Sequence, residues 1–135
     1  MKVLLDAGTL AAMLRGRLGV VLQLSRCRPV DVAVPVVARM QVEIGLQADS
    51  RAQARYAKLL REFIDSVQVI EFGEAEAEAA ARIGSYLAAS GIEIGAIELM
   101  LAGTAVAHQR TLVAEALAPY RGVPGLALES WLEQR

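Results

Sequence analysis

The sequence predicts an α/β fold in three α/β/α layers, with a central, mainly parallel sheet of four to five strands. Three observations support this class. Short apolar runs, several of them β-branched, alternate with longer segments of helical periodicity. The first run is continuously apolar, as in a strand covered on both faces. The 135 residues, 55% of them hydrophobic, are enough for one domain with a real core. We therefore expect a single domain over residues 1–135.

The first half of the chain supplies two strands and four helices. The strands are predicted over residues 3–5 and 31–34, and the helices over 10–14, 18–24, 36–46 and 50–64. Thr9 is a suitable cap for the first helix, and Pro35 suits the first turn of the third. On the third helix, the spacing of three and four residues marks an apolar face made of Val36, Val37, Met40 and Ile44.

The second half continues the alternation. Strands are predicted over 67–72 and 111–114, with a last edge strand over 126–128, and helices over 74–89 and 96–108. Residues 130–135 are expected to form a tail or a helical turn. We interpret the glutamates at 74, 76 and 78 as a solvated face. His108, at a helix end, is interpreted as a helix-end residue and not as a general base.

Composition narrows the classes of site and partner. The net charge of −1 gives no global signature of nucleic-acid binding, although twelve of the fourteen basic residues are Arg. Arg15 or Arg39 would suit phosphate contacts, but an Arg-rich composition also follows from GC-rich coding. The single Cys27 and single His108 make a zinc site of these ligands implausible. Any metal would be held by oxygen, which indicates Mg²⁺ or Mn²⁺.

The expected location is the cytoplasm, without a membrane partner. No apolar run approaches the roughly 18 residues needed to span a bilayer. The N-terminus has one Lys, a very short apolar stretch and then an acid, which is not the pattern of a secretory signal. A lone Cys27 also agrees with a reducing compartment.

Four acids are candidates for a functional site. Asp6 follows the first strand and Glu115 follows the fourth, so both stand at the edge where parallel sheets place their ligands. Glu98 begins a helix at the same edge, and Glu43 would reach it from a helix packed alongside. Three of these acids have a structural alternative. Asp6 can cap a helix, Glu43 can lie on the surface, and Glu98 can face a helix dipole.

Carboxylates gathered within a few ångströms repel one another unless a cation neutralises them. Such a cluster would bind Mg²⁺ or Mn²⁺ and activate water for attack on a phosphodiester.

Four stretches stand out along the chain, and they are LLDAG at 4–8, PVVARMQVEIG at 35–45, IGAIELMLAGTAVAHQRTLVA at 94–114 and GVPGL at 122–126. Together they resemble the PIN domain, and especially the small VapC-like ribonuclease toxins of bacterial toxin–antitoxin pairs. The resemblance implies a Mg²⁺- or Mn²⁺-dependent RNA endonuclease with Asp6, Glu43 and Glu98 as catalytic metal ligands. It also implies an RNA substrate, a cognate antitoxin as partner and a homodimer.

The sequence departs from the family pattern at three places. Glu98 stands where the family has Asp, and Ala116 stands at the family's fourth acidic or amide position, beside Glu115. Ala7 and Gly8 replace the usual Thr-Asn pair. One hypothesis is therefore a ribonuclease toxin with a weakened site, in which Glu115 replaces the lost fourth ligand. The alternative is a catalytically inactive PIN-like scaffold for protein interaction or RNA binding. An unrelated regulatory α/β domain is a third possibility, which the two helices before the second strand disfavour.

Overall fold

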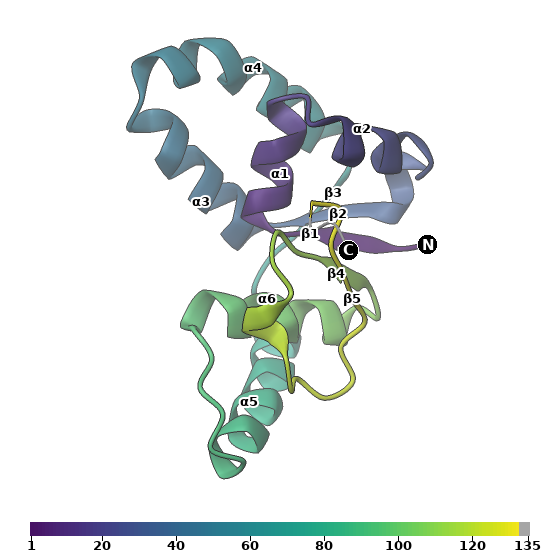
Figure 1. Cartoon of the computed structure of the whole chain (residues 1–135), viewed down its shortest axis with the longest axis vertical. Helices are drawn as coiled ribbons and strands as arrows, with labels where there is room; N and C mark the ends of the chain where they lie inside the picture. The colour runs from purple at the N-terminus through teal and green to yellow at the C-terminus, as the bar shows by residue number, and fades with distance from the viewer. Residues whose placement is uncertain (133–135) are drawn as a thin grey trace.

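A five-stranded parallel sheet forms the centre of the molecule (Figure 1). We describe it from a computed structural model, in which residues 1–132 are described. The spatial strand order is β3-β2-β1-β4-β5. The strands are β1 (Val3–Leu5), β2 (Val32–Pro35), β3 (Gln68–Ile70), β4 (Thr111–Val113) and β5 (Leu128–Glu129). The predicted α/β class with a parallel sheet is therefore confirmed.

Helices cover both faces of the sheet (Figure 1). One layer holds α1 (Ala7–Leu14), α2 (Leu18–Ser25), α3 (Val36–Gln47) and α4 (Ser50–Ser66). The opposite layer holds α5 (Glu74–Ala89) and α6 (Ala96–Ala107). Two short 3-10 turns complete the described elements, η1 (Pro29–Asp31) and η2 (Ala118–Tyr120).

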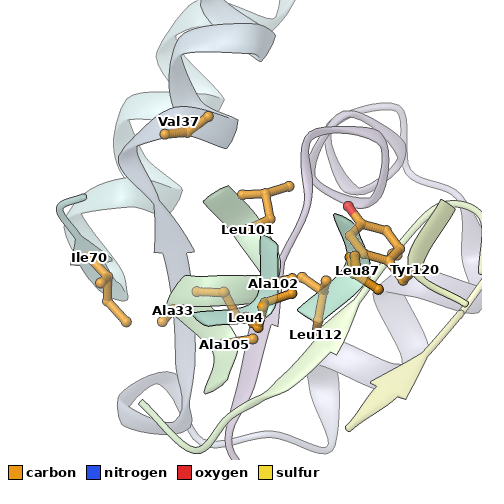
Figure 2. Packing of buried hydrophobic residues seen from close by; sticks show 12 residues of the cluster. Leu4, Ala33, Val37, Ile70, Leu87, Leu101, Ala102, Ala105, Leu112 and Tyr120 are labelled. Carbon is orange, nitrogen blue, oxygen red and sulfur yellow. The ribbon is translucent and has the colours of Figure 1, made fainter. Parts of the chain in front are cut away.

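Alternate side chains of the strands supply two separate cores. On β1, Leu4 packs into the cluster under α5 and α6, whereas Val3 and Leu5 pack into the cluster under α1, α3 and α4. Figure 2 shows the first cluster, where Leu4 and Leu112 from neighbouring strands meet Ala102 and Ala105 of α6. This is the alternation that a strand buried on both faces requires.

The helices lie close to their predicted ranges. β1 spans its predicted residues and β2 is shifted by one, whereas the other three strands are shorter than expected. The third predicted strand shrinks to Gln68–Ile70, and the last one shifts to Leu128–Glu129. Asp6, not Thr9, caps α1, because its carboxylate accepts the backbone N–H of Thr9. Part of the expected tail over 130–135 lies outside the described residues. Within residues 1–132, no helix has both the length and the apolar character to cross a bilayer.

The apolar face predicted for α3 is only partly buried. Val36, Met40 and Ile44 are exposed, with Ile44 at 60% of its full accessibility. The side chains that α3 buries belong to a neighbouring face of the helix, and they are Val37, Ala38, Val42 and Leu46. The helix is thus rotated about its axis relative to the expectation, which changes which polar residues face the sheet edge.

A buried arginine closes the opposite, amino-terminal edge of the sheet. Nη1 of Arg110 donates to the carbonyl oxygens of Val3 (3.2 Å) and Asp31 (2.9 Å), and Nη2 donates to Oε1 of Gln68 (3.0 Å). Burial lowers the pKa of this guanidinium from its ordinary value. Arg110 therefore ties β1, η1 and β3 together at the edge away from the candidate site.

Candidate functional site

A cavity of about 220 Å³ lies at the carboxyl ends of β1 and β4. β1 pairs with β2 on one side and with β4 on the other, so the strand order reverses between β1 and β4. The cavity lies at this switch point of the sheet. Five segments line it, and the lining residues are Asp6, Ala7, Gly8, Gln41, Ile97, Glu98, Leu101, Glu115, Ala116, Pro119 and Tyr120. Three of the four predicted acids are therefore brought to one place.

Asp6 is the fixed acid of the cavity. Its Oδ1 accepts the N–H of Thr9 at 2.8 Å, which caps α1, and its Oδ2 accepts the N–H of Glu115 at 2.8 Å. The residue is 9% exposed. Asp6 is therefore a helix cap, as its structural alternative predicted. It also joins the turn after β1 to the turn after β4 and lines the cavity.

Glu98 lies in the first turn of α6, where a carboxylate faces the positive end of the helix dipole. Its side chain folds back over Gly95, the cap residue of the helix, so closely that a Cβ at position 95 would collide with it. Glu98 is half-buried and lines the same cavity as Asp6. Both of its predicted roles are therefore compatible with its position.

Glu115 follows β4 and lies against Gly8 of α1. A Cβ placed on Gly8 would come within 2.6 Å of both Cβ and Oε1 of Glu115. Glycine at position 8 thus leaves the space that the Glu115 side chain occupies. Ala116 lines the same cavity but offers no donor or acceptor side chain.

The expectation that Glu43 faces the same cleft is wrong. Its Oε1 pairs with Nε of Arg39 at 2.6 Å, and it lines cavities on the outer side of α3. Gln41 is the α3 residue that lines the acidic cavity. Residues two positions apart on a helix point about 200° apart, so Gln41 and Glu43 cannot share a face. Glu43 lies with Met40 and Ile44 on the exposed face of α3, and the apolar pattern of the sequence did not identify that face as exposed.

No family model and no curated protein matches the sequence. Solved structures do match its fold. DNA-bound VapBC from Salmonella typhimurium is similar at a TM-score of 0.86 and 21% identity, over 97% of this chain and 98% of that chain. FitAcB from Neisseria gonorrhoeae is similar at 0.86 and 21%, over 98% and 99%. VapBC-5 of Mycobacterium tuberculosis, from a family of toxin-antitoxin systems, is similar at 0.68 and 20%, over 96% and 98%.

The fold is PIN-like. At these identities the likeness establishes the fold alone, and the activity has to be argued from the residues at the site.

In this PIN-like fold, Tyr120 is a second cavity residue that sequence reasoning missed. It ends η2 and is 5% exposed, with its ring in the core beneath α5 and α6. Burial and the charges of Asp6 and Glu98 raise the pKa of the phenol above its ordinary value of 10.0. The hydroxyl therefore keeps its proton at neutral pH. The 3-10 turn that carries Tyr120 has no periodicity, so no pattern in the sequence revealed it.

The cavity of the PIN-like fold has the chemistry of a site for a hard divalent cation, since its acids and amide all offer oxygen. The ligands are not preassembled, however. Among residues 1–132, no three His, Cys, Asp or Glu side chains stand close enough to hold one ion. Asp6 is held by two backbone N–H groups. The side chain of Glu98 lies over Gly95, and that of Glu115 lies over Gly8.

A second group of titratable side chains in the PIN-like fold, Glu76 and His108, links two helices and has a structural role. Nε2 of His108, the C-cap of α6, lies 2.7 Å from Oε2 of Glu76 on α5. Oε1 of Glu76 accepts the N–H of Gly73 at 2.8 Å, which caps the amino end of α5 from the third residue of the helix. These bonds lower the pKa of Glu76, and the bond from the N–H of Gly73 has the larger effect. Glu76 is buried, so the prediction of a wholly solvated glutamate face is wrong at this position.

Proposed function

We propose that the chain is a toxin-type endoribonuclease that requires Mg²⁺ or Mn²⁺. The observation that carries the proposal is the convergence of Asp6, Glu98 and Glu115, from three separate elements, on one cavity at the switch point of the sheet. Parallel α/β sheets bind their ligands at this place. The PIN-like fold and the toxin-antitoxin structures among its neighbours support the same activity.

In this proposal Asp6, Glu98 and Glu115 hold the cation. Bound there, Mg²⁺ or Mn²⁺ would supply an activated water for attack on a phosphodiester. Asp6 has its orientation set by the amides of Thr9 and Glu115, so it is the most rigid of the three ligands. The carboxylates alone would repel a phosphate, which makes the reaction dependent on a cation that neutralises them.

We also propose an antitoxin as the partner, by analogy with the toxin-antitoxin complexes. A cavity of about 440 Å³ lies between α1, α3 and α4 and shares Ala7, Gly8 and Gln41 with the acidic cavity. Its lining is largely apolar and includes Leu14 and Tyr56. An apolar antitoxin segment seated there would adjoin the acidic cavity and could block access to it.

A second candidate is a PIN-like scaffold that binds RNA or protein without cutting. The observation that favours it is that two positions beside Asp6 in the cavity carry no charge. α3 contributes the amide of Gln41, and the turn after β4 contributes Ala116. An amide carries no charge, so the cation would be held by fewer carboxylates. Glu43, paired with Arg39 on the outer face, cannot make up the difference.

Cleavage of single-stranded RNA with Mn²⁺ separates the two candidates. We expect the wild-type protein and Glu43→Gln to cut at the same rate, and an Asp6→Asn/Glu98→Gln double variant to have lost activity. Glu43→Gln is the matched control, because it removes one carboxylate outside the cavity. Equal cleavage by the wild type and the double variant would exclude the proposed nuclease site. RNA binding by the wild type without cleavage would favour the scaffold.

A further inference from the structure

The ring of Tyr120 is buried in the core, whereas its hydroxyl oxygen is not fully buried and belongs to the lining of the acidic cavity. The residue is 5% exposed, and among residues 1–132 its hydroxyl has no hydrogen-bond partner. Figure 2 shows the hydroxyl oxygen at the end of the ring that points away from Leu112. A hydroxyl at a cavity wall that forms no hydrogen bond within the described residues has its donor free for a group that enters the cavity.

The backbone holds this hydroxyl in place. Pro119 precedes Tyr120, the N–H of Tyr120 donates to the carbonyl of Leu117 at 3.0 Å, and its carbonyl accepts the N–H of Val123 at 3.2 Å. The ring packs in the core with Leu87 and Leu112. A donor fixed in this way is preorganised, because its position does not depend on the ligand.

The acidic cavity has few other donors. Its polar side chains are the three carboxylates, which accept hydrogen bonds, together with the amide of Gln41 and the hydroxyl of Tyr120. No Lys, Arg or His is among the lining residues. An anionic group that enters the cavity therefore meets only two side-chain donors, and Tyr120 is the more rigid and more buried of them.

We propose that the Tyr120 hydroxyl donates a hydrogen bond to a phosphate oxygen of the RNA strand bound at the acidic cavity. The inference rests on the proposed function, because the phosphodiester is the substrate of that function. Tyr120 is then a substrate-contacting residue that positions the phosphate beside Asp6 and Glu98. The carboxylates of these two residues are the alternative acceptors, although neither accepts from the hydroxyl in the structure.

Tyr120→Phe tests this inference, because it removes the hydroxyl and keeps the ring in the core. Tyr86→Phe, at an exposed tyrosine of α5, is the matched control. We expect Tyr120→Phe to weaken the binding of a single-stranded RNA oligonucleotide, measured by anisotropy with Ca²⁺, by roughly ten- to a hundredfold. We expect its Mn²⁺ affinity to stay within about twofold, and its melting temperature to be unchanged or higher, since the hydroxyl has no partner to lose.

The outcomes separate this inference from the proposed function. RNA cleavage by the wild type with unchanged RNA binding in Tyr120→Phe would overturn the inference and leave the nuclease intact. Binding without cleavage by the wild type, weakened in Tyr120→Phe, would keep the inference and overturn the nuclease. A wild type that neither binds nor cleaves RNA would overturn both. A lower melting temperature, or a loss of Mn²⁺ affinity, in Tyr120→Phe would assign the hydroxyl to a carboxylate instead of the phosphate.

Discussion

At the scale of single residues, Gly8 determines where the carboxylate of Glu115 can lie. The second residue of α1 is an ordinary helix position, where Ala would normally stabilise the helix relative to Gly. Here the space of a Cβ is filled by Glu115 itself. Position 8 is therefore a packing constraint on a candidate metal ligand.

Gly8→Ala should lower stability and weaken Mn²⁺ binding, because the new methyl group displaces Glu115. We expect a loss of roughly 1–3 kcal/mol in the free energy of unfolding, measured by urea denaturation. Gly45→Ala is the control, since nothing lies within 4 Å of a Cβ there and the residue is inside α3. This control should gain about 1 kcal/mol. If both variants gained stability, the placement of Glu115 against Gly8 would be incorrect.

Three of the four acids lie at one sheet edge, as the sequence predicted, and the reason differs from residue to residue. Asp6 and Glu115 follow strands, so strand pattern alone locates them. Glu98 is located by the helix start. Glu43 was assigned to the site by the resemblance of residues 35–45. Both faces of this helix carry apolar side chains, exposed at Met40 and Ile44 and buried elsewhere, so the pattern does not show which face packs on the sheet.

At the scale of elements, Glu76 caps the amino end of α5 and links this helix to the end of α6. Its two oxygens are engaged with the N–H of Gly73 and with the ring of His108. These interactions lower its pKa from the ordinary value of 4.5, so the carboxylate is more stable in the folded chain than in the unfolded one. The stabilisation is present above about pH 4.5 and is lost as the pH falls through the lowered value.

Glu76→Gln should therefore destabilise the protein at neutral pH, by about 1 kcal/mol, and progressively less in acid. Chemical denaturation at a series of pH values between 7 and 3 measures the difference from the wild type. Glu78→Gln, at an exposed position of the same helix, should show almost no difference at any of these pH values. A Glu76→Gln deficit that stayed constant down to pH 3 would contradict a role for the ionised carboxylate.

Helices were easier to predict than the parts between them. The predicted range of α5 is its observed range, because most of its sixteen residues are Ala, Glu and other strong helix formers, and they follow a cap glycine. The strands are only two to four residues long, and such short runs carry too little periodicity to fix their ends. The turn η2, which carries Tyr120, had no signal of this kind.

At the scale of the whole molecule, the strand order creates the acidic cavity. Alternating strands and helices predicted a parallel sheet, but the pattern does not say that β4 pairs with β1. That pairing brings the turns after β1 and β4 together, and the bond from Glu115 N to Asp6 Oδ2 joins them. The separation of 109 residues between these partners explains why spacing along the chain could not reveal the contact.

The homodimer remains a prediction, and the outer face of α3 is the surface that supports it. Val36, Met40 and Ile44 are exposed there around the pair Arg39–Glu43. Light scattering should give twice the chain mass of 14.4 kDa, and Ile44→Glu should reduce it to one chain with an unchanged melting temperature. Leu18→Glu, at an exposed apolar position of α2, is the control. A wild-type mass of one chain would contradict the dimer.

The central claim is that the cavity of Asp6, Glu98 and Glu115, and not Glu43, binds the divalent cation. Titration calorimetry with Mn²⁺ tests it most directly, on the wild type, Glu98→Gln and Glu43→Gln. We predict micromolar binding by the wild type and by Glu43→Gln, and a loss of at least about tenfold in affinity for Glu98→Gln. Absence of binding by the wild type, or a loss confined to Glu43→Gln, would contradict the claim.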